Sequence, residues 1–228
     1  MRTAPTRAAK SPTPLPRRRV CRVMTLGLDD AVLRAKALAT APGRTLLGLT
    51  GPPGAGKSTL AERIVAEVAG SVLVGMDAYH LAHTVLVERG TVGRKGAPDT
   101  FDAAGYVALL GRLRAGEPGV VWAPQFRREI EDAIAGAVPV PPDAALVVTE
   151  GNYLLLPEAP WSSVPEMLDE VWYVDLPDAT RLDRLVRRHE HFGRSADQAL
   201  EKSYGSDEAN ARLVMATRER ADAVIVAG

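Results

Sequence analysis

Residues 51–59, GPPGAGKST, constrain the fold of this chain more than any other feature of its sequence. They match the pattern G-x-x-x-x-G-K-[ST] in full, and they lie between a short apolar run and a helical pattern, the context that this motif requires. The glycines permit backbone angles that a Cβ would block, so successive N–H groups turn inward as an anion-binding nest beside a helix N-terminus. The motif predicts a nucleotide-binding loop made of Gly51, Gly54, Ala55, Gly56, Lys57, Ser58 and Thr59.

Short apolar runs rich in β-branched residues alternate with helical patterns along most of the chain. Continuous apolar strands separated by helices are typical of a parallel sheet that is covered on both faces. We therefore predict an α/β fold with a doubly wound, mostly parallel five-stranded sheet, the fold of P-loop nucleoside triphosphate hydrolases, with a lid helix. The expected strands are 45–50, 71–76, 145–149, 171–176 and 223–226, with 120–122 as a further candidate, and the expected helices are 28–40, 57–69, 102–115, 178–191 and 206–220.

In sheets of this kind ligands bind beyond the carboxyl ends of the strands, so acids at those ends are candidate site residues. Asp77 follows the second predicted strand, where a carboxylate accepts a proton from an attacking hydroxyl or holds Mg²⁺; its alternative role is to cap a turn. Glu150 follows the third, and we expect it to hold Mg²⁺ with the Ser58 hydroxyl or to position the substrate. Lys57 is expected to reach the β- and γ-phosphates of the nucleotide.

The predicted helix 178–191 carries three arginines on one face. At 100° per residue, Arg181, Arg184 and Arg188 fall within about 60° of each other. Their forked donors match the oxygen pairs of a transferring phosphate, although spacing alone favours an ordinary solvated face. Asp178, at the start of this helix, is expected to be its N-cap.

Charge and composition divide the chain into two parts. Residues 1–23 hold seven of the 28 basic side chains, none of the 28 acidic ones and four prolines, which leaves a net charge of −7 on the rest. We expect a disordered basic tail over 1–25 and a P-loop kinase domain over 26–228. The acidic body argues against nucleic acid as a partner, and no apolar run is long enough to span a membrane. The single cysteine, Cys21, fits a cytoplasmic protein.

Five segments together resemble a known family. They are the P-loop, MDAYH at 76–80, RKGAPDTFD at 94–102, EGNY at 150–153 and the arginine-rich stretch 181–189. With these, the chain resembles the P-loop nucleoside/nucleotide kinase-like proteins grouped with uridine kinase, bacterial pantothenate kinase and phosphoribulokinase, and within them the fructose-transport-kinase-like branch. The resemblance covers residues 28–228, and RKGAPDTFD is its most discriminating segment.

The resemblance implies roles for individual positions. Asp77 matches the catalytic base of the group, and the arginines of 178–191 match the helix that closes over ATP, so the catalytic set becomes Lys57, Asp77, Arg184 and Arg188. The residues expected at the acceptor are Tyr79, His80, Arg94, Lys95, Glu150 and Tyr153. The chain departs from the group at Ala78, where glycine is common, and at Arg127-Arg128, where an acid often follows the aromatic residue.

The leading hypothesis is an ATP-dependent kinase that phosphorylates a hydroxyl of a small metabolite. A nucleoside is the first candidate acceptor, and pantothenate or a sugar is the alternative. A nucleotide-binding regulatory protein without phosphotransfer is the alternative of another class. The chain has no Asn-Lys-x-Asp motif, which argues against a GTPase. It also lacks the Leu-Ser-Gly-Gly-Gln signature, which argues against a transport ATPase. The expected cofactor is Mg²⁺ and the expected partners are ATP and the acceptor; the sequence leaves a homodimer open.

Overall fold

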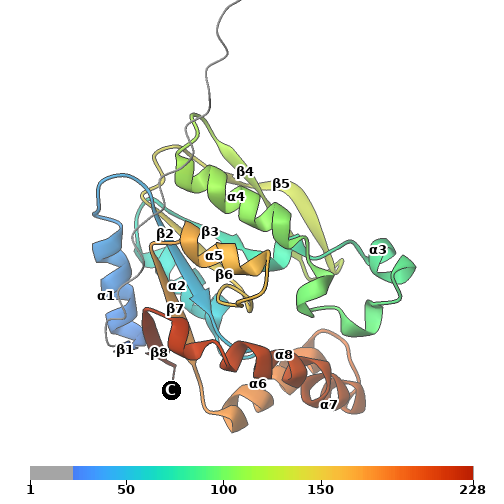
Figure 1. Ribbon diagram of the computed structural model, residues 1–228. Coiled ribbons are helices and arrows are strands. Elements are labelled where there is room, and N and C mark those ends of the chain that lie inside the picture. Colours follow the sequence, from blue (N-terminus) through green and yellow to red (C-terminus); the bar gives the residue numbers. More distant parts are fainter. Residues whose placement is uncertain (1–22, 228) are drawn as a thin grey trace, which may run out of the picture.

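The fold is described from a computed structural model, which places residues 23–227; the expected disorder of 1–22 lies outside the described residues. Its centre is a parallel sheet with strand order β1-β8-β7-β2-β6-β3 (Figure 1). The strands are β1 (Met24–Gly27), β2 (Thr45–Thr50), β3 (Ser71–Gly75), β6 (Leu146–Glu150), β7 (Glu170–Asp175) and β8 (Ala223–Val226). All five predicted strands are present, and β1 adds a sixth at the edge, so the expected boundary between residues 25 and 26 falls inside a strand.

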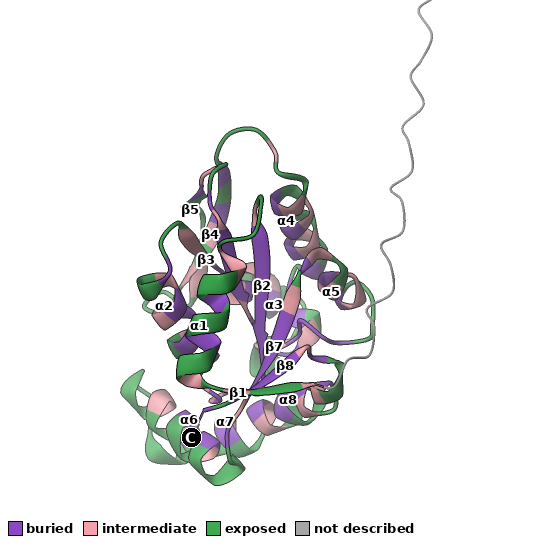
Figure 2. Cartoon of the chain, turned by 90° about the vertical axis from the view of Figure 1, so that its left-hand side faces the viewer, coloured by how far each residue is buried: buried purple, intermediate pink, exposed green. Residues whose placement is uncertain are grey.

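Helices cover both faces of the sheet, as a doubly wound fold requires. They are α1 (Leu28–Leu38), α2 (Lys57–Glu67), α3 (His83–Glu88), α4 (Ala103–Ala115), α5 (Val164–Met167), α6 (Asp178–His191), α7 (Ala196–Tyr204) and α8 (Ser206–Met215). Figure 2 shows α1 and α2 on one side of the strands and α4 and α5 on the other. Short 3₁₀ turns occupy Met76–Tyr79, Val92–Arg94, Pro98–Thr100, Trp161–Ser163 and Arg218–Arg220.

Two cores explain why the strands read as continuous apolar runs. One lies between the sheet and α1 and α2, and the other between the sheet and α4, α5 and α8. All six residues of β2 are buried, because this strand has neighbours on both edges and helices on both faces. The residues that follow β2 therefore leave the sheet from a central strand. This places the P-loop near the middle of the row formed by the carboxyl ends of the strands.

A separate two-stranded antiparallel hairpin is formed by β4 (Val121–Arg127) and β5 (Asp132–Val140). The candidate strand at 120–122 is the start of β4, whereas β5 was not predicted. Its sequence, DAIAGAVPV, is mostly exposed and includes Gly136 and Pro139, so it lacks the apolar signal of a buried strand. The turn of this hairpin carries Arg128, which reaches the candidate site.

The helix predicted at 178–191 is observed with these bounds, but its expected N-cap is corrected. Pro177 occupies the cap position, and Asp178 is the first residue of the helix. The Asp178 carboxylate instead accepts a hydrogen bond from Arg181 Nε at 2.9 Å. Within residues 23–227, none of the helices combines the length and the apolar character needed to cross a bilayer.

Candidate active site

The P-loop adopts the backbone that its glycines predicted. Gly54 has φ of 85°, and a Cβ there would lie 2.7 Å from the carbonyl oxygen of Arg181, in α6. At Gly51, a Cβ would lie 2.5 Å from the carbonyl oxygen of Val174, in β7. Both positions need glycine because neighbouring backbone approaches closely, so the loop is fixed by its packing as well as by its own conformation.

Lys57 begins α2 and is buried at the centre of the loop. Its Nζ donates to the carbonyl oxygens of Gly51 at 2.9 Å and Pro52 at 3.1 Å. Burial lowers the pKa of Lys57 to about 8, against the opposite effect of the carboxylates of Glu150 and Asp77. The ammonium group is thus held near two acids and is ready to exchange carbonyl partners for phosphate oxygens.

A cavity of about 480 Å³ opens over the P-loop. Its lining combines loop residues with three arginines from two other elements, the β4–β5 turn and α6. The lining residues are Gly54, Gly56, Lys57, Ser58, Thr59, Arg128, Arg184 and Arg188. Loop N–H groups and four cationic side chains at one cavity suit a polyphosphate.

Arg181 does not share this cavity with Arg184 and Arg188, which corrects the grouping expected from helical spacing. Its side chain is fully buried and pairs with Asp178 at 2.9 Å and with Glu208 of α8 at 2.6 Å. It also donates to the carbonyl oxygen of Pro53, at 3.3 Å. Arg181 therefore fastens α6 to both the P-loop and α8. The angular spacing along the helix predicts that the three arginines share one face. It does not predict how far each side chain is buried.

Asp77 and Glu150 come together because their strands pair. In the register of β3 and β6, Gly75 lies opposite Glu150, so Asp77 leaves the sheet beside that carboxylate. Burial and the negative charge of Asp77 raise the pKa of Glu150 to about 7, although Lys57, Arg128 and the hydroxyl of Ser58 act in the opposite direction. Two acids and one buried lysine therefore share one electrostatic environment beside the P-loop.

Arg128 is a site residue that the sequence did not reveal as one. Its Nη2 lies 3.7 Å from Asp77 Oδ2, and its guanidinium group lies 5.9 Å from the ring centroid of Phe192, just beyond α6. The only available signal was the departure at Arg127-Arg128 from the acid that is common in the resembling group. Spacing offers no other clue, because tertiary folding brings the hairpin turn to the strand ends.

The two aromatic residues after Asp77 point in different directions. His80 packs against Phe101 at 4.0 Å and Phe126 at 5.2 Å between ring centroids, and its Nδ1 donates to the backbone oxygen of Asp77 at 2.7 Å. Burial lowers the pKa of His80. Tyr79 instead packs edge-on to Tyr106 at 5.3 Å, against the core, so the structure does not bring its ring to the residues around the cavity.

The segment 94–96 is held in place from several sides. Tyr153, which is fully buried, donates its hydroxyl to the carbonyl oxygen of Gly96, and Asn210 of α8 donates to the same oxygen at 3.1 Å. Lys202 of α7 donates to the carbonyl oxygen of Lys95 at 3.1 Å. Tyr153 thus supports the loop from within. The two basic side chains of this segment have acidic partners. The Nζ of Lys95 lies 3.3 Å from the Glu131 carboxylate and 5.3 Å from the centroid of the Phe126 ring, whereas exposed Arg94 pairs with Asp99 at 2.5 Å.

Comparison with known proteins finds no family model that matches the chain. Individual relatives do match. The "ATP-dependent kinase-like protein notR'" of Aspergillus versicolor is 36% identical over 132 residues, 54% of this chain and 76% of the relative. The "Putative uridine kinase C227.14" of Schizosaccharomyces pombe is 30% identical over 200 residues, 82% of this chain and 84% of the relative. The pantothenate kinase of Limosilactobacillus reuteri is 29% identical over 138 residues, which are 57% of this chain and 44% of that protein.

The fold is also found among solved structures. A "putative fructose transport system kinase" from Silicibacter sp. TM1040 superposes with a TM-score of 0.78 at 35% identity, covering 86% of this chain and 98% of that one. A "possible uridine kinase" from Bacillus stearothermophilus superposes with a TM-score of 0.54 at 19% identity, covering 87% and 98%, and this likeness concerns the fold alone.

Proposed function

We propose that this chain transfers the γ-phosphoryl group of ATP to a hydroxyl of a nucleoside. The chain belongs to the P-loop kinases that include uridine kinase-like and pantothenate kinase-like proteins, and it is a phosphotransferase with a hydroxyl acceptor. The observation that carries the reaction is that Lys57, which lines the phosphate cavity, lies near Asp77 and Glu150 at the carboxyl ends of β3 and β6. The nucleoside acceptor is supported by the name of the S. pombe relative, which the chain matches over most of its length.

On the donor side, the N–H groups of the P-loop and the ammonium of Lys57 hold the β- and γ-phosphates. Arg184 and Arg188 of α6 close over the nucleotide and neutralise charge on the transferring group, a role supported by their place in the wall of the cavity. Catalysis of this kind depends on positioning and electrostatics rather than on a covalent intermediate. Arg181 acts indirectly, since it fixes α6 against the loop.

Mg²⁺ fits the oxygen ligands beside the P-loop. We propose that the hydroxyl of Ser58 and the carboxylate of Glu150 hold it, directly or through water, which agrees with the few protein ligands that Mg²⁺ takes in nucleotide sites. The Ser58 hydroxyl lowers the pKa of Glu150, and this interaction supports the placement of the two side chains around one ion. When bound, Mg²⁺ neutralises charge on the β- and γ-phosphates.

On the acceptor side, Asp77 is the proposed general base. It lies at the end of β3, beside Lys57 and Glu150, where the incoming hydroxyl must meet the γ-phosphate. Lys95 and the ring of His80 are the proposed walls of the acceptor site. Tyr153 supports the Lys95 side, because its hydroxyl donates to the carbonyl oxygen of the adjacent Gly96. Closure of α6 excludes water and so limits hydrolysis of ATP.

One observation favours a second acceptor class. The cation of Arg128 lies beside the proposed base, in the stretch Phe126-Arg127-Arg128, where the resembling group often carries an acid after the aromatic residue. A guanidinium group there suits an acceptor that carries a carboxylate, as pantothenate does. A sugar is the third acceptor to test, because the Silicibacter protein is named for a fructose transport system.

The test is turnover of purified protein with Mg-ATP and one acceptor at a time: uridine, pantothenate or fructose. We expect ADP release to depend on one of them, and mass spectrometry of that acceptor to show one added phosphoryl group. The Lys57→Ala protein, prepared in the same way, controls for contaminating kinases. ADP release that no acceptor stimulates, together with tight ATP binding, would instead support a nucleotide-binding protein without phosphotransfer.

A further inference from the structure

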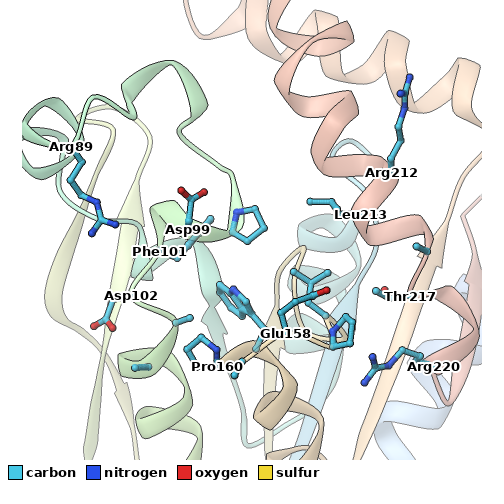
Figure 3. A pocket seen from close by; sticks show the side chains of 18 residues that line it. Arg89, Asp99, Phe101, Asp102, Glu158, Pro160, Arg212, Leu213, Thr217 and Arg220 are labelled. Atoms are coloured by element: carbon cyan, nitrogen blue, oxygen red, sulfur yellow. The ribbon is translucent and has the colours of Figure 1, made fainter.

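A second and larger cavity, of about 820 Å³, lies away from the P-loop and shares no lining residue with the phosphate cavity. Four parts of the chain that are distant in sequence form it, as Figure 3 shows: Arg89 after α3, the stretch 98–104, the loop 156–161 after β6, and the C-terminal half of α8 with the turn that follows. Its volume falls in the range of about 300–1,000 Å³ that is typical of small-molecule sites.

The floor of this cavity is apolar. The rings of Phe101 and Trp161 meet edge to face, 5.8 Å apart, and Leu156 lies in the same lining. Leu213 of α8 completes the wall, yet 48% of its surface is exposed. An apolar side chain at the mouth of a cavity whose floor is aromatic offers a ligand a continuous apolar surface.

Three cations and three acids surround this floor. Arg212 lies 3.7 Å from Glu208, whereas Arg89 and Arg220 stand on opposite sides of the cavity (Figure 3), and neither of their side chains forms an ion pair or hydrogen bond within residues 23–227. Two of the three acids are already engaged. Asp99 pairs with Arg94 at 2.5 Å, and Asp102 accepts from the N–H of Gly105 at 2.8 Å as the N-cap of α4. Glu158 is the third acid.

From this arrangement we propose that the cavity is a binding site for an amphipathic anion, a molecule with an apolar body and one carboxylate or phosphate group. The aromatic floor takes the apolar body, because burying it removes apolar surface from water. Arg89 or Arg220 takes the anionic group, because a guanidinium fork matches carboxylate and phosphate oxygens.

The proposed site is adjacent to the kinase centre without being part of it. Phe101 forms its floor and packs against His80 at 4.0 Å, and the Nδ1 of His80 donates to the backbone oxygen of Asp77 at 2.7 Å. On the other side, α8 carries Asp207, whose carboxylate lies 2.7 Å from His189 of α6. A ligand in the cavity therefore contacts two elements that lead to the proposed base and to the lid helix.

The experiment titrates the full chain with octanoate, octyl phosphate and octan-1-ol and follows backbone and indole N–H signals by NMR. We expect one of the two anions to shift the signals of Trp161 and Leu213 and to bind about tenfold or more tightly than the neutral alcohol, the effect of a charged hydrogen bond. The tighter of the two anions identifies the preferred group. Mg-ATP should leave this affinity unchanged.

Four variants locate the site. Leu213→Asp, which places a negative charge in the wall beside the bound anion, should weaken binding of the anion by about tenfold, and so should one of Arg89→Gln and Arg220→Gln, whichever removes the guanidinium group that holds the anion. Leu33→Asp, on the exposed face of α1, is the matched control and should bind as the wild type does. The proposal is overturned if the alcohol binds as tightly as both anions, if none of the three cavity variants loses affinity, or if Mg-ATP displaces the anion, which would place it in the phosphate cavity.

Discussion

The donor and acceptor halves of the proposed active site are built in different ways. The donor half comes from one continuous stretch, residues 51–59, completed by α6. The acceptor half draws on the turn after β3, the segment 94–96, the β4–β5 hairpin and helices α7 and α8. A short motif can specify the first half, whereas only tertiary packing assembles the second. Related proteins can therefore differ in their acceptors, as the names of the uridine and pantothenate kinases indicate.

The halves also differ in how firmly their cations are held. Lys57 is buried and donates to two backbone carbonyl oxygens. Arg128 is 37% exposed, and its distance of 3.7 Å from Asp77 is long for an ion pair. Exposed pairs of this kind contribute little energy, about 0–1 kcal/mol. We infer that the donor half is preorganised and that the acceptor itself completes the other half.

The largest loss is expected from Lys57→Ala, which removes the central cation of the donor half. Turnover should fall on the order of 10³–10⁵-fold, the range for a cation that stabilises a transferring phosphoryl group. Steady-state ADP release measures the loss, and circular dichroism verifies the fold. Lys36→Ala, which removes an exposed lysine paired with Glu67, is the control and should retain full activity. A folded Lys57→Ala protein with normal turnover would refute the assignment of the donor half.

Asp77→Asn is the corresponding test of the acceptor half. Asparagine keeps the shape of the side chain but not its basicity, so kcat should fall by about 10²–10⁴-fold, the usual contribution of a general base. The affinity for ATP should change little, which equilibrium binding would show. Asp143→Asn, before the amino end of β6, is the matched control. A collapse of ATP binding would instead make Asp77 a magnesium ligand and Glu150 the candidate base.

The pH profile tests whether charge couples the two halves. Glu150, with a pKa raised to about 7, should act as a carboxylate, and Lys57, with a pKa lowered to about 8, as an ammonium group. The value of kcat/KM for Mg-ATP should therefore rise as the pH increases through about 7 and fall above about 8, by about tenfold per pH unit on each side. Because the groups interact, these values belong to the cluster rather than to single residues.

Glu150→Gln should abolish the acidic limb of that profile and leave the alkaline limb. A wild-type profile that stays flat between about pH 6 and about pH 9 would show that neither group titrates in the free enzyme in this range.

The same division between local and tertiary features explains what the sequence could predict. Buried parallel strands read as apolar runs, so their ends located Asp77 and Glu150 correctly at one edge of the sheet. Strand β1 was missed because it is a short, mostly exposed edge strand. The periodicity of α6 described angles but not depth, so buried Arg181 could not be separated from Arg184. Arg128 reaches the site only through the folding of its hairpin.

The smallest expected effect comes from Arg128→Gln, and it decides which half this residue serves. Its guanidinium group lines the phosphate cavity and also approaches Asp77. We expect kcat to fall about tenfold, the lower end for a charged hydrogen bond, because the group is partly exposed. Arg127→Gln is the matched control, since the adjacent arginine is exposed and is not part of the cavity lining.

A double-mutant cycle then separates the two roles of Arg128. If it acts by orienting the carboxylate of Asp77, its substitution should have little further effect in the Asp77→Asn protein, because the partner charge is already gone. If it acts on the transferring phosphate, the two losses should multiply. We expect the first result, because in the structure Asp77 is the acid that Arg128 approaches, at 3.7 Å. If the two substitutions instead lower kcat independently, so that their fold-losses multiply, and the KM for ATP rises, Arg128 would belong to the donor half. The acceptor half would then have no cation assigned beside its base.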